Sequence, residues 1–568
     1  MLSSTKIRST TPTIDVYVKL AQYPVLCDQV RMRMREEMFR RGIVDPIDFE
    51  MEVKQLAQQS QRREGLNDPY GQEDEATWQK RIAIIRDLHT DNYFGNNLGP
   101  SLLEQLIQES LKNKQPLTQD PNLRFNPEIA PWAILFRQGL SYEALPPPKR
   151  ELVQHHLEEL KVVLIKRLIS DNLHFIGIAK KVFSIRDLRW IYERLLGTGK
   201  IGGKAAGVLL ALATLRQKGD VLGPDISRLV DIPETYFIGS EIIYEYIYIN
   251  KLERFVNQKY LTNKEMREEY PQIVQAFLTG EFPSYIIDQL RDIVRRHDNL
   301  PYVVRSSSLL EDNFSYSFAG KYDSYFCFNS EDETENIESL MKAIRRIYAS
   351  TFNPDAMVMR QEYGLIDYDE RMAVMVQPLI GTKYGRYFWP TISGIGISCN
   401  PLGCEERDDG MLRLVWGYDK RTDTPFADAE ATLVPLNKPS HNGNGRSKAT
   451  VSPQPTVRVI DLEEKKFKQL PIEALLHPGC PYLAYISTEL PASELDNHKP
   501  RFALTFDYFT RDPKFIKLMR TALMRLYNVF KTPVIFEFVV ELTENASGVD
   551  YKLYILQCRP YLETAVMD

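Results

Sequence analysis

The spacing of apolar residues changes near residue 195, and this change limits the folds that the chain can adopt. Before it, apolar residues recur three and four positions apart between charged ones, which predicts helices with one buried face. After it, short β-rich runs alternate with helical segments, as is typical of α+β or α/β proteins. The helical segments are 30–43, 73–90, 99–113 and 146–173, and the β-rich runs include YVVRSSS, YDSYFCFN and RMAVMVQPLI.

The length of 568 residues exceeds what one core ordinarily supports, so about two to four domains are expected. We predict a mostly helical N-terminal region over 1–190, which carries no chemical signature. Two α+β lobes are expected to follow, over 191–330 and 331–568. The polar stretch NKPSHNGNGRSKATVSPQPT at 437–456 predicts a surface insertion in the second lobe.

Composition and charge exclude several classes of protein. A net charge of −5 leaves no basic excess, so we expect no nucleic-acid partner. The N-terminus has no apolar signal segment, and no apolar run reaches the length of a membrane span. The six cysteines are scattered without a CxxC motif, which favours reduced thiols in a cytoplasmic protein.

The stretch GTGKIGGKAAG at 197–207 is rich in glycine and opens an apolar, alanine-rich segment. A dinucleotide-binding motif would need a strand before it, and the preceding residues look helical. A Walker A loop would need a hydroxyl where Ala205 stands. The remaining interpretation is a pair, Gly202 and Gly203, that lets the backbone approach a nucleotide while Lys204 reaches its phosphates. A simple helix start explains the glycines as well.

Other polar residues support a phosphate site. Arg305 ends a β-rich run before a serine-rich turn, and arginine suits bidentate phosphate contacts. The segments VIFEFVVEL and KLYILQCRPY predict a hairpin. Because side chains alternate between faces, Glu537 shares a face with Ile535, and Gln557 shares one with Arg559. A carboxylate, an amide and a guanidinium on neighbouring strands suit Mg²⁺ and polyphosphate.

Six motifs in order carry a family resemblance: IGGKAAG, VVRSSSLLEDNFSYSFAGKYDSYF, LMKAIRRIYASTFNPDAMVMRQEYG, MAVMVQPLI, TPVIFEFVV and LYILQCRPY. Together they resemble the nucleotide-binding domain of phosphoenolpyruvate synthase and pyruvate phosphate dikinase. The resemblance covers about residues 195–562, interrupted near 440. It implies an ATP-grasp fold, in which two α+β lobes clasp ATP, and transfer of a phosphoryl group from ATP to a histidine on a separate domain.

The resemblance also implies residue roles. Lys204 and Arg305 would contact the ATP phosphates, and Arg559 would stabilise charge on the transferring groups, so these three cations are the candidate catalytic residues. Glu537 and Gln557 would hold Mg²⁺ and the phosphate tail. Such roles fit phosphoryl transfer, which depends mostly on positioning and charge stabilisation.

Two further positions follow from the same resemblance. Gln377 would line the nucleotide cleft. Gly320 would be the hinge of a loop, EDNFSYSFAG, that covers the phosphates.

The sequence departs from the family pattern in three places. Ile535 stands where the family has an aspartate that helps to bind metal, so Mg²⁺ binding should be weakened. WGYDKRTDTPFAD at 416–428 replaces a glycine-rich signature. The family's histidine motif and its C-terminal barrel are not found in the 568 residues, so we expect that the chain alone does not make phosphoenolpyruvate.

Three functions stay open at this level. The first is an ATP-dependent phosphotransferase, or kinase module, that works with a separate acceptor such as a phosphohistidine-domain protein. The second is a catalytically weak or inactive regulator that senses ATP. The third is a purely structural protein. Ile535 favours the second, whereas the joint presence of Lys204, Arg305, Glu537, Gln557 and Arg559 favours the first.

Overall fold

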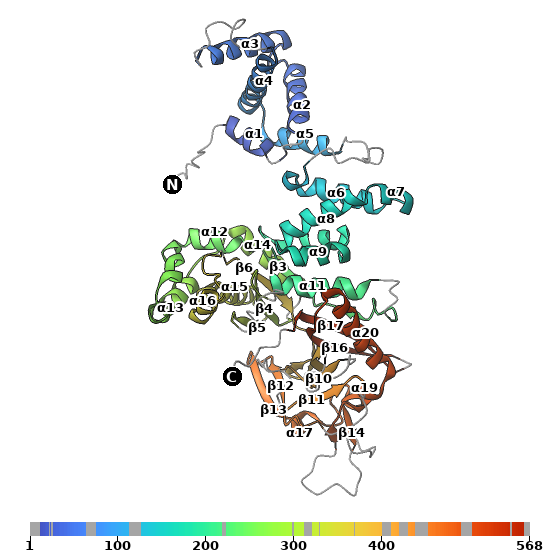
Figure 1. The fold of residues 1–568 in the computed structure, drawn as a ribbon. Helices are drawn as coiled ribbons and strands as arrows, with labels where there is room; N and C mark the ends of the chain where they lie inside the picture. Colours follow the sequence, from blue (N-terminus) through green and yellow to red (C-terminus); the bar gives the residue numbers. More distant parts are fainter. Residues whose placement is uncertain are drawn as a thin grey trace. The chain divides into compact units, whose positions relative to one another are not determined.

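A computed structural model of the chain describes 12–21, 23, 26–63, 75–112, 126–217, 223–297, 300–311, 321–328, 330–368, 370–399, 410–419, 430–437, 452–489, 502–545 and 548–561. The chain forms two compact units, 1–163 and 164–568. Their mixture of helices and sheets, with a helical N-terminal region, confirms the predicted α+β class (Figure 1). None of the helices in these ranges is long and apolar enough to cross a bilayer.

Every element described in the N-terminal unit is a helix. Val30, Met34 and Met38 recur at helical spacing in α2 and are buried, as the sequence pattern predicts. The predicted helix over 146–173 is two helices in the structure, because Val153 interrupts it. The helical elements are α1 (Pro12–Ala21), α2 (Cys27–Arg40), α3 (Pro46–Arg63), α4 (Glu75–Asn97), α5 (Pro100–Lys112), η2 (Pro127–Ile129), α6 (Trp132–Glu143), α7 (Pro147–Leu152) and α8 (Gln154–Leu168), the last of which runs into the second unit.

The first sheet of the second unit has strand order β1-β3-β6-β4-β5. Its strands are β1 (Leu195–Leu196), β3 (Tyr236–Ile238), β4 (Tyr302–Ser308), β5 (Ser324–Cys327) and β6 (Met372–Pro378). The accompanying helices are α9 (Leu173–Val182), α10 (Ile185–Tyr192), α12 (Ile242–Ile249), η3 (Glu253–Tyr260), α13 (Asn263–Leu278), α14 (Ser284–Arg296), α15 (Glu333–Ser350) and α16 (Pro354–Glu362).

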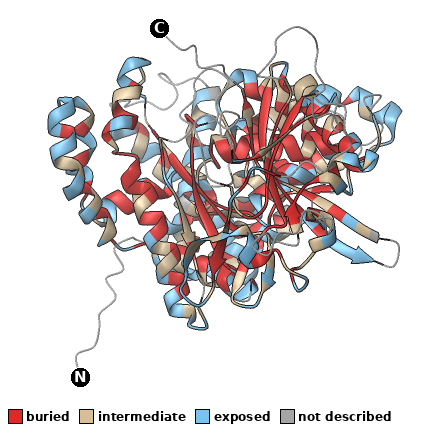
Figure 2. Cartoon of the chain, turned by 90° about the horizontal axis from the view of Figure 1, so that it is seen from below, coloured by how far each residue is buried: buried red, intermediate tan, exposed pale blue. Residues whose placement is uncertain are grey.

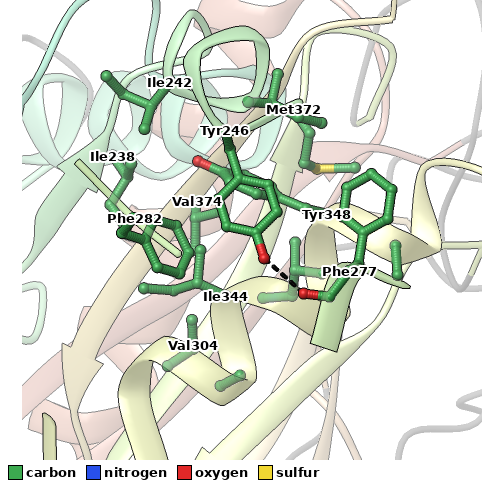
Figure 3. Close-up of a cluster of buried hydrophobic side chains, with 14 of the residues drawn as sticks. Ile238, Ile242, Tyr246, Phe277, Phe282, Val304, Ile344, Tyr348, Met372 and Val374 are labelled. Atoms are coloured by element: carbon green, nitrogen blue, oxygen red, sulfur yellow. Dashed lines mark hydrogen bonds between the residues drawn. The ribbon is translucent and has the colours of Figure 1, made fainter. Parts of the chain in front are cut away.

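Large aromatic side chains fill the core of this sheet. The Tyr246 ring lies 4.7 Å from the Phe282 ring and 5.6 Å from the Tyr348 ring, centroid to centroid (Figure 3). Its buried hydroxyl donates to the Phe277 carbonyl oxygen at 2.5 Å, which satisfies the polar end of a ring that is otherwise surrounded by apolar groups. β4 and β6 are neighbours in the interior of the sheet and are buried along their whole length. Figure 2 shows many of the chain's strands coloured as buried.

The second sheet has strand order β11-β10-β9-β16-β17-β2. Its strands are β2 (Val230–Asp231), β9 (Ile392–Ile397), β10 (Met411–Val415), β11 (Thr432–Pro435), β16 (Val534–Asn545) and β17 (Gly548–Pro560). Helix α11 (Gly203–Arg216) packs on β17, and α20 (Pro513–Phe530) packs on β16 and β9. Phe536 and Phe538 lie over Gly396 and Gly394 of the neighbouring strand, so Ile535 and Glu537 point to the opposite face.

Two smaller sheets complete the unit. One has the order β13-β12-β8-β7 and the other pairs β14 with β15. Most of the predicted insertion at 437–456 lies outside the described residues. The remaining elements are β7 (Thr382–Tyr384), β8 (Tyr387–Trp389), β12 (Thr456–Asp461), β13 (Lys466–Pro471), α17 (Ile472–Leu475), α18 (Leu483–Ile486), β14 (Ser487–Glu489), β15 (Phe502–Leu504) and α19 (Asp507–Arg511).

Candidate functional site

Arg305 joins the two larger sheets. It lies in β4 of the first sheet, and only 4% of its side chain is exposed. Its Nη1 atom donates to the Leu556 carbonyl oxygen of the second sheet at 2.7 Å. Its Nη2 atom donates to Oε1 of Gln557 at 2.5 Å and lies 3.4 Å from Oε2 of Glu537. A guanidinium from one sheet is therefore held by the β16–β17 hairpin of the other.

A β-bulge in this hairpin contains the carbonyl group that Arg305 contacts. Glu537 lies directly opposite Gln557 in the predicted hairpin, but beyond this pair the register shifts and Leu556 has no residue opposite it. A bulge interrupts the regular strand pairing and turns the local backbone. The carbonyl oxygen that accepts from Arg305 belongs to this extra residue.

Arg559 provides a second cation beside the same hairpin position. It follows Gln557 by two residues, so both side chains leave one face of β17, and it lies opposite Ile535. Its side chain is half-buried, and no hydrogen bond or ion pair joins it to another residue in the described ranges. Arg559 can therefore contact an added anion without breaking an existing pair.

The environment of Ile535 is apolar. Ile535, Ile397 and Met411 form a buried cluster, in which Ile535 is 5% exposed. Partly buried side chains that extend this cluster are Ile395, Cys399, Leu433 and Tyr561. Ile535, which precedes Glu537 on this face, thus belongs to a buried apolar cluster.

The glycines at the start of α11 allow close approach to β4. A Cβ on Gly202, whose φ is +81°, would lie 1.6 Å from the Ser307 carbonyl oxygen. One on Gly203 would lie 1.7 Å from the Glu311 carbonyl oxygen. The Ala205 N–H in the first helical turn donates to the Ser307 hydroxyl at 3.1 Å. These glycines allow the start of α11 to pack closely against the first sheet. The Ala205 N–H, one of the donors at this helix start, is already bonded within the protein.

Lys204 is buried in a pair of its own. Its Nζ atom donates to the Ser306 hydroxyl at 2.9 Å and to Oε1 of Glu311 at 2.5 Å. The side chains of Lys204 and Glu311 are 5% and 0% exposed. In this arrangement the lysine holds α11 to the end of β4, and Ser306 and Glu311 take two of its three ammonium donors.

A second buried carboxylate, that of Glu370, lies at the same end of β4. Glu370 accepts hydrogen bonds from the hydroxyls of Ser308 and Tyr322, and its Oε2 atom is 3.9 Å from Nε of Arg360. Burial raises the pKa of Glu370 to about 7, since the charged form loses its hydration. The backbone N–H of Ser308 donates to Glu311 at 2.9 Å, so both carboxylates hold this end of β4.

Gln377 stands apart from these contacts. Gln377 is buried in β6, where its Nε2 atom donates to the Thr235 hydroxyl at 2.8 Å. No hydrogen bond joins it to Arg305 within the part of the chain that is described. Gly320 lies outside the described residues. The structure therefore brings together Arg305, Glu537 and Gln557, with Arg559 on the same hairpin face.

Three contributors were not identified from the sequence. They are the Leu556 carbonyl, the partner of Lys204 at Glu311, and Glu370. A backbone bulge carries no residue-type signal, and Glu311 is 107 positions from Lys204. An acidic residue three positions after the end of a serine-rich strand was the available hint for Glu311.

Comparison with known proteins defines the class to which this arrangement belongs. The family model described as "Pyruvate phosphate dikinase, AMP/ATP-binding domain" matches residues 198–566. The chain belongs to this family, which agrees with the resemblance seen in the motifs. The matched residues include both larger sheets apart from β1, and all the proposed site residues.

Similar curated proteins are phosphotransferases or phosphoenolpyruvate synthases. The phosphoenolpyruvate synthase of Aeropyrum pernix is 24% identical over 231 residues, which are 38% of this chain and 24% of that protein. The rifampicin phosphotransferase of Streptomyces sviceus is 31% identical over 112 residues, 20% of this chain and 11% of that protein. The matched stretch thus spans a quarter or less of these relatives.

The donors near Glu537 do not fit a magnesium ion. Mg²⁺ prefers several oxygen ligands in octahedral geometry, usually including carboxylates. Here Gln557 Oε1 accepts from Arg305, Glu537 lies beside the same guanidinium, and Ile535 provides no ligand. In the described residues, no group of three or more His, Cys, Asp or Glu side chains could hold a metal ion.

Proposed function

We propose that residues 198–566 bind ATP, with the phosphates placed between Arg305 and Arg559 on the face of the β16–β17 hairpin that carries Glu537 and Gln557. The observation that carries the proposal is the Arg305 contact itself, which sets a buried guanidinium of the first sheet against the hairpin of the second. Guanidinium groups suit phosphate because they offer several donors in a fixed plane. The family match supports the nucleotide.

The sequence-based prediction that this module is an ATP-grasp fold remains part of the proposal. In the proposal, Arg559 would meet the phosphates first, because no described residue competes for it. Arg305 would orient them, and its position would depend on Leu556 and Gln557. The roles predicted for Gly202, Gly203, Lys204, Gly320 and Gln377 remain hypotheses about the same site.

Two uses of bound ATP remain as candidates. One is transfer of a phosphoryl group to a separate acceptor, such as a histidine domain on another protein. The other is regulation, in which binding of the nucleotide is itself the signal. The apolar surroundings of Ile535 favour the second, because they leave few ligands for the metal predicted from the resemblance.

Calorimetric titration with ATP tests the binding proposal. Arg559→Met should weaken binding by about tenfold to a hundredfold, since a charge-assisted contact contributes roughly 1.5–3 kcal/mol. The matched control is Lys552→Met, which removes a cation from the same strand; Lys552 already pairs with Asp231 at 2.6 Å. Equal affinity of wild type and Arg559→Met would contradict the proposal.

Phosphorus NMR on the same samples distinguishes the two uses. Conversion of ATP to AMP would establish dikinase-type chemistry and direct the search towards the acceptor. ATP that binds but stays intact, also in the presence of a phosphohistidine-domain protein, would favour regulation. Glu537→Gln, with Glu541→Gln as the control on the same strand, shows whether any turnover depends on the site.

A further inference from the structure

The face of β16 around Glu537 is poor in anionic groups. Ile535 precedes Glu537 on this face, and the residues paired with these two on β17 are Arg559 and Gln557. On the other side, β9 places Ile397 and Ile395 opposite the same two positions. Among these neighbours, which all belong to the described residues, Glu537 contributes the only carboxylate.

The apolar cluster beside Glu537 disfavours a hydrated cation. Ile535 is 5% exposed, and it packs against Ile397 and Met411, which are 0% and 2% exposed. A divalent cation placed against this apolar cluster would lose water and gain no oxygen ligand from the side chains of the cluster. Dehydration is costly for Mg²⁺ in particular. Ile535 therefore disfavours metal binding at the position where a second carboxylate ligand, beside Glu537, would be needed.

The charges at this position also oppose a cation. Oε2 of Glu537 lies 3.4 Å from Arg305, which offsets part of the negative charge, and Oε1 of Gln557 accepts from the same guanidinium at 2.5 Å. Arg559 adds a further positive charge opposite Ile535. Mg²⁺ and a polyphosphate would meet the same two guanidinium groups and one carboxylate, and two cations against one anion favour the polyphosphate.

From this arrangement we infer that the site takes a nucleoside triphosphate as the metal-free polyanion, and that Ile535 sets this preference. Arg305 and Arg559 neutralise the phosphates that Mg²⁺ would otherwise neutralise. This inference rests on the proposed ATP binding and deepens it by naming the ionic form of the ligand. It requires no covalent step, because it concerns binding alone.

Titration of the full chain with ATP, in EDTA and in excess Mg²⁺, tests the inference. We expect ATP to bind more tightly in EDTA than in excess Mg²⁺, because Mg²⁺ captures the free nucleotide; equal affinity in the two conditions would contradict the inference. Binding that requires Mg²⁺ would overturn the inference while supporting the proposed function. Failure to bind under both conditions would overturn the proposed function and the inference with it.

Electron paramagnetic resonance with Mn²⁺ and ATP gives an independent readout, because free and protein-bound Mn²⁺ differ in signal. Wild type should hold no stoichiometric Mn²⁺ beyond that bound by ATP in solution. Ile535→Asp, which adds a carboxylate two residues from Glu537, should gain a bound Mn²⁺. Ile535→Asn is the matched control of similar size without the charge, and it should gain none.

Either of two results in this second experiment would contradict the inference. The first is a protein-bound Mn²⁺–ATP complex in wild type. The second is an Ile535→Asp variant that is folded by circular dichroism, binds ATP and gains no metal. If the variant does not fold, the wild-type spectrum and the two titrations still decide.

Discussion

Two buried carboxylates behind β4 are stabilised in different ways. Glu311 is paired directly with the Lys204 ammonium, whereas Glu370 receives two hydroxyl donors and has Arg360 at 3.9 Å. A buried charge is tolerated when it is paired and otherwise shifts towards its neutral form. Lys204, which the sequence assigned to phosphate binding, is therefore also expected to contribute to folding.

Replacing Lys204 by Met should be strongly destabilising. It leaves the fully buried Glu311 without its ammonium partner, and loss of one partner of a buried pair costs about 3–5 kcal/mol of unfolding free energy. Urea denaturation measures the loss. Lys200→Met is the matched control, because Lys200 pairs with the exposed Asp171 at 2.9 Å and should cost about 1 kcal/mol or less. Equal losses in the two variants would contradict the assigned role.

Glu370 predicts a specific dependence of stability on pH. Burial raises the folded-state pKa of this carboxyl from 4.5 to about 7, in spite of hydrogen bonds from Ser308 and Tyr322 and the nearby Arg360. A raised pKa means that the fold favours the protonated form. The stabilisation is fully present below about pH 4.5 and is lost as the pH rises through about 7, by roughly 3 kcal/mol in total.

The comparison of wild type with Glu370→Gln isolates this effect. The variant keeps a neutral side chain at every pH, so its stability relative to wild type should rise by roughly 3 kcal/mol between about pH 5 and 8. Thermal or urea unfolding across this range measures the difference. A difference that is constant with pH would show that Glu370 is ionised in the folded protein throughout.

At the scale of elements, local patterns predicted the strands and the helices well, and the contacts between them poorly. Alternation in VIFEFVVEL placed Glu537 on the face of Ile535, and the register sets it opposite Gln557. The same pattern could not reveal the bulge at Leu556, because one extra residue changes no residue type. The glycine pair predicted that the backbone approaches a nucleotide. It could not say that the approaching groups would be the carbonyls of Ser307 and Glu311.

Helix α11 reaches β17 through another glycine, which gives a prediction for the element. A Cβ on Gly207 would lie 2.1 Å from the Cys558 carbonyl oxygen, so Gly207→Ala must push the helix away from the strand. The expected loss is about 1–3 kcal/mol. Gly177→Ala in α9 is the control: nothing lies within 4 Å of its added Cβ, and alanine should stabilise that helix by about 0.5–1 kcal/mol.

The thermal unfolding midpoints of the two glycine variants should therefore shift in opposite directions from the wild-type midpoint. A lower midpoint for Gly207→Ala with a higher one for Gly177→Ala supports the close packing of α11 on β17. If both variants unfold above the wild-type temperature, the helix and the strand are separated by more than the structure gives. This measurement requires no ligand, so it is independent of the proposed function.

At the scale of the whole molecule, the two units have separate cores. The N-terminal cluster runs from Val16 to Ile134, and the core of the first sheet runs from Leu196 to Val376, with no shared residue. Units with cores of their own are expected to fold separately. The family match begins at residue 198, so the residues that define the proposed nucleotide site all belong to the second unit.

A fragment covering 126–568 should therefore fold and bind ATP with the affinity of the full chain, within about twofold. The cut falls among residues 113–125, outside every described helix. It removes α1–α5 and every buried residue of the N-terminal cluster except Ile134, while keeping all strands and residues 126–163 of the first unit. Circular dichroism checks the fold, and calorimetry compares the two affinities. A loss of tenfold or more, about 1.4 kcal/mol, in a folded fragment would mean that the N-terminal helices influence the nucleotide site. Unchanged affinity would show that α1–α5 do not influence nucleotide binding, so that the determinants of this binding lie within residues 126–568.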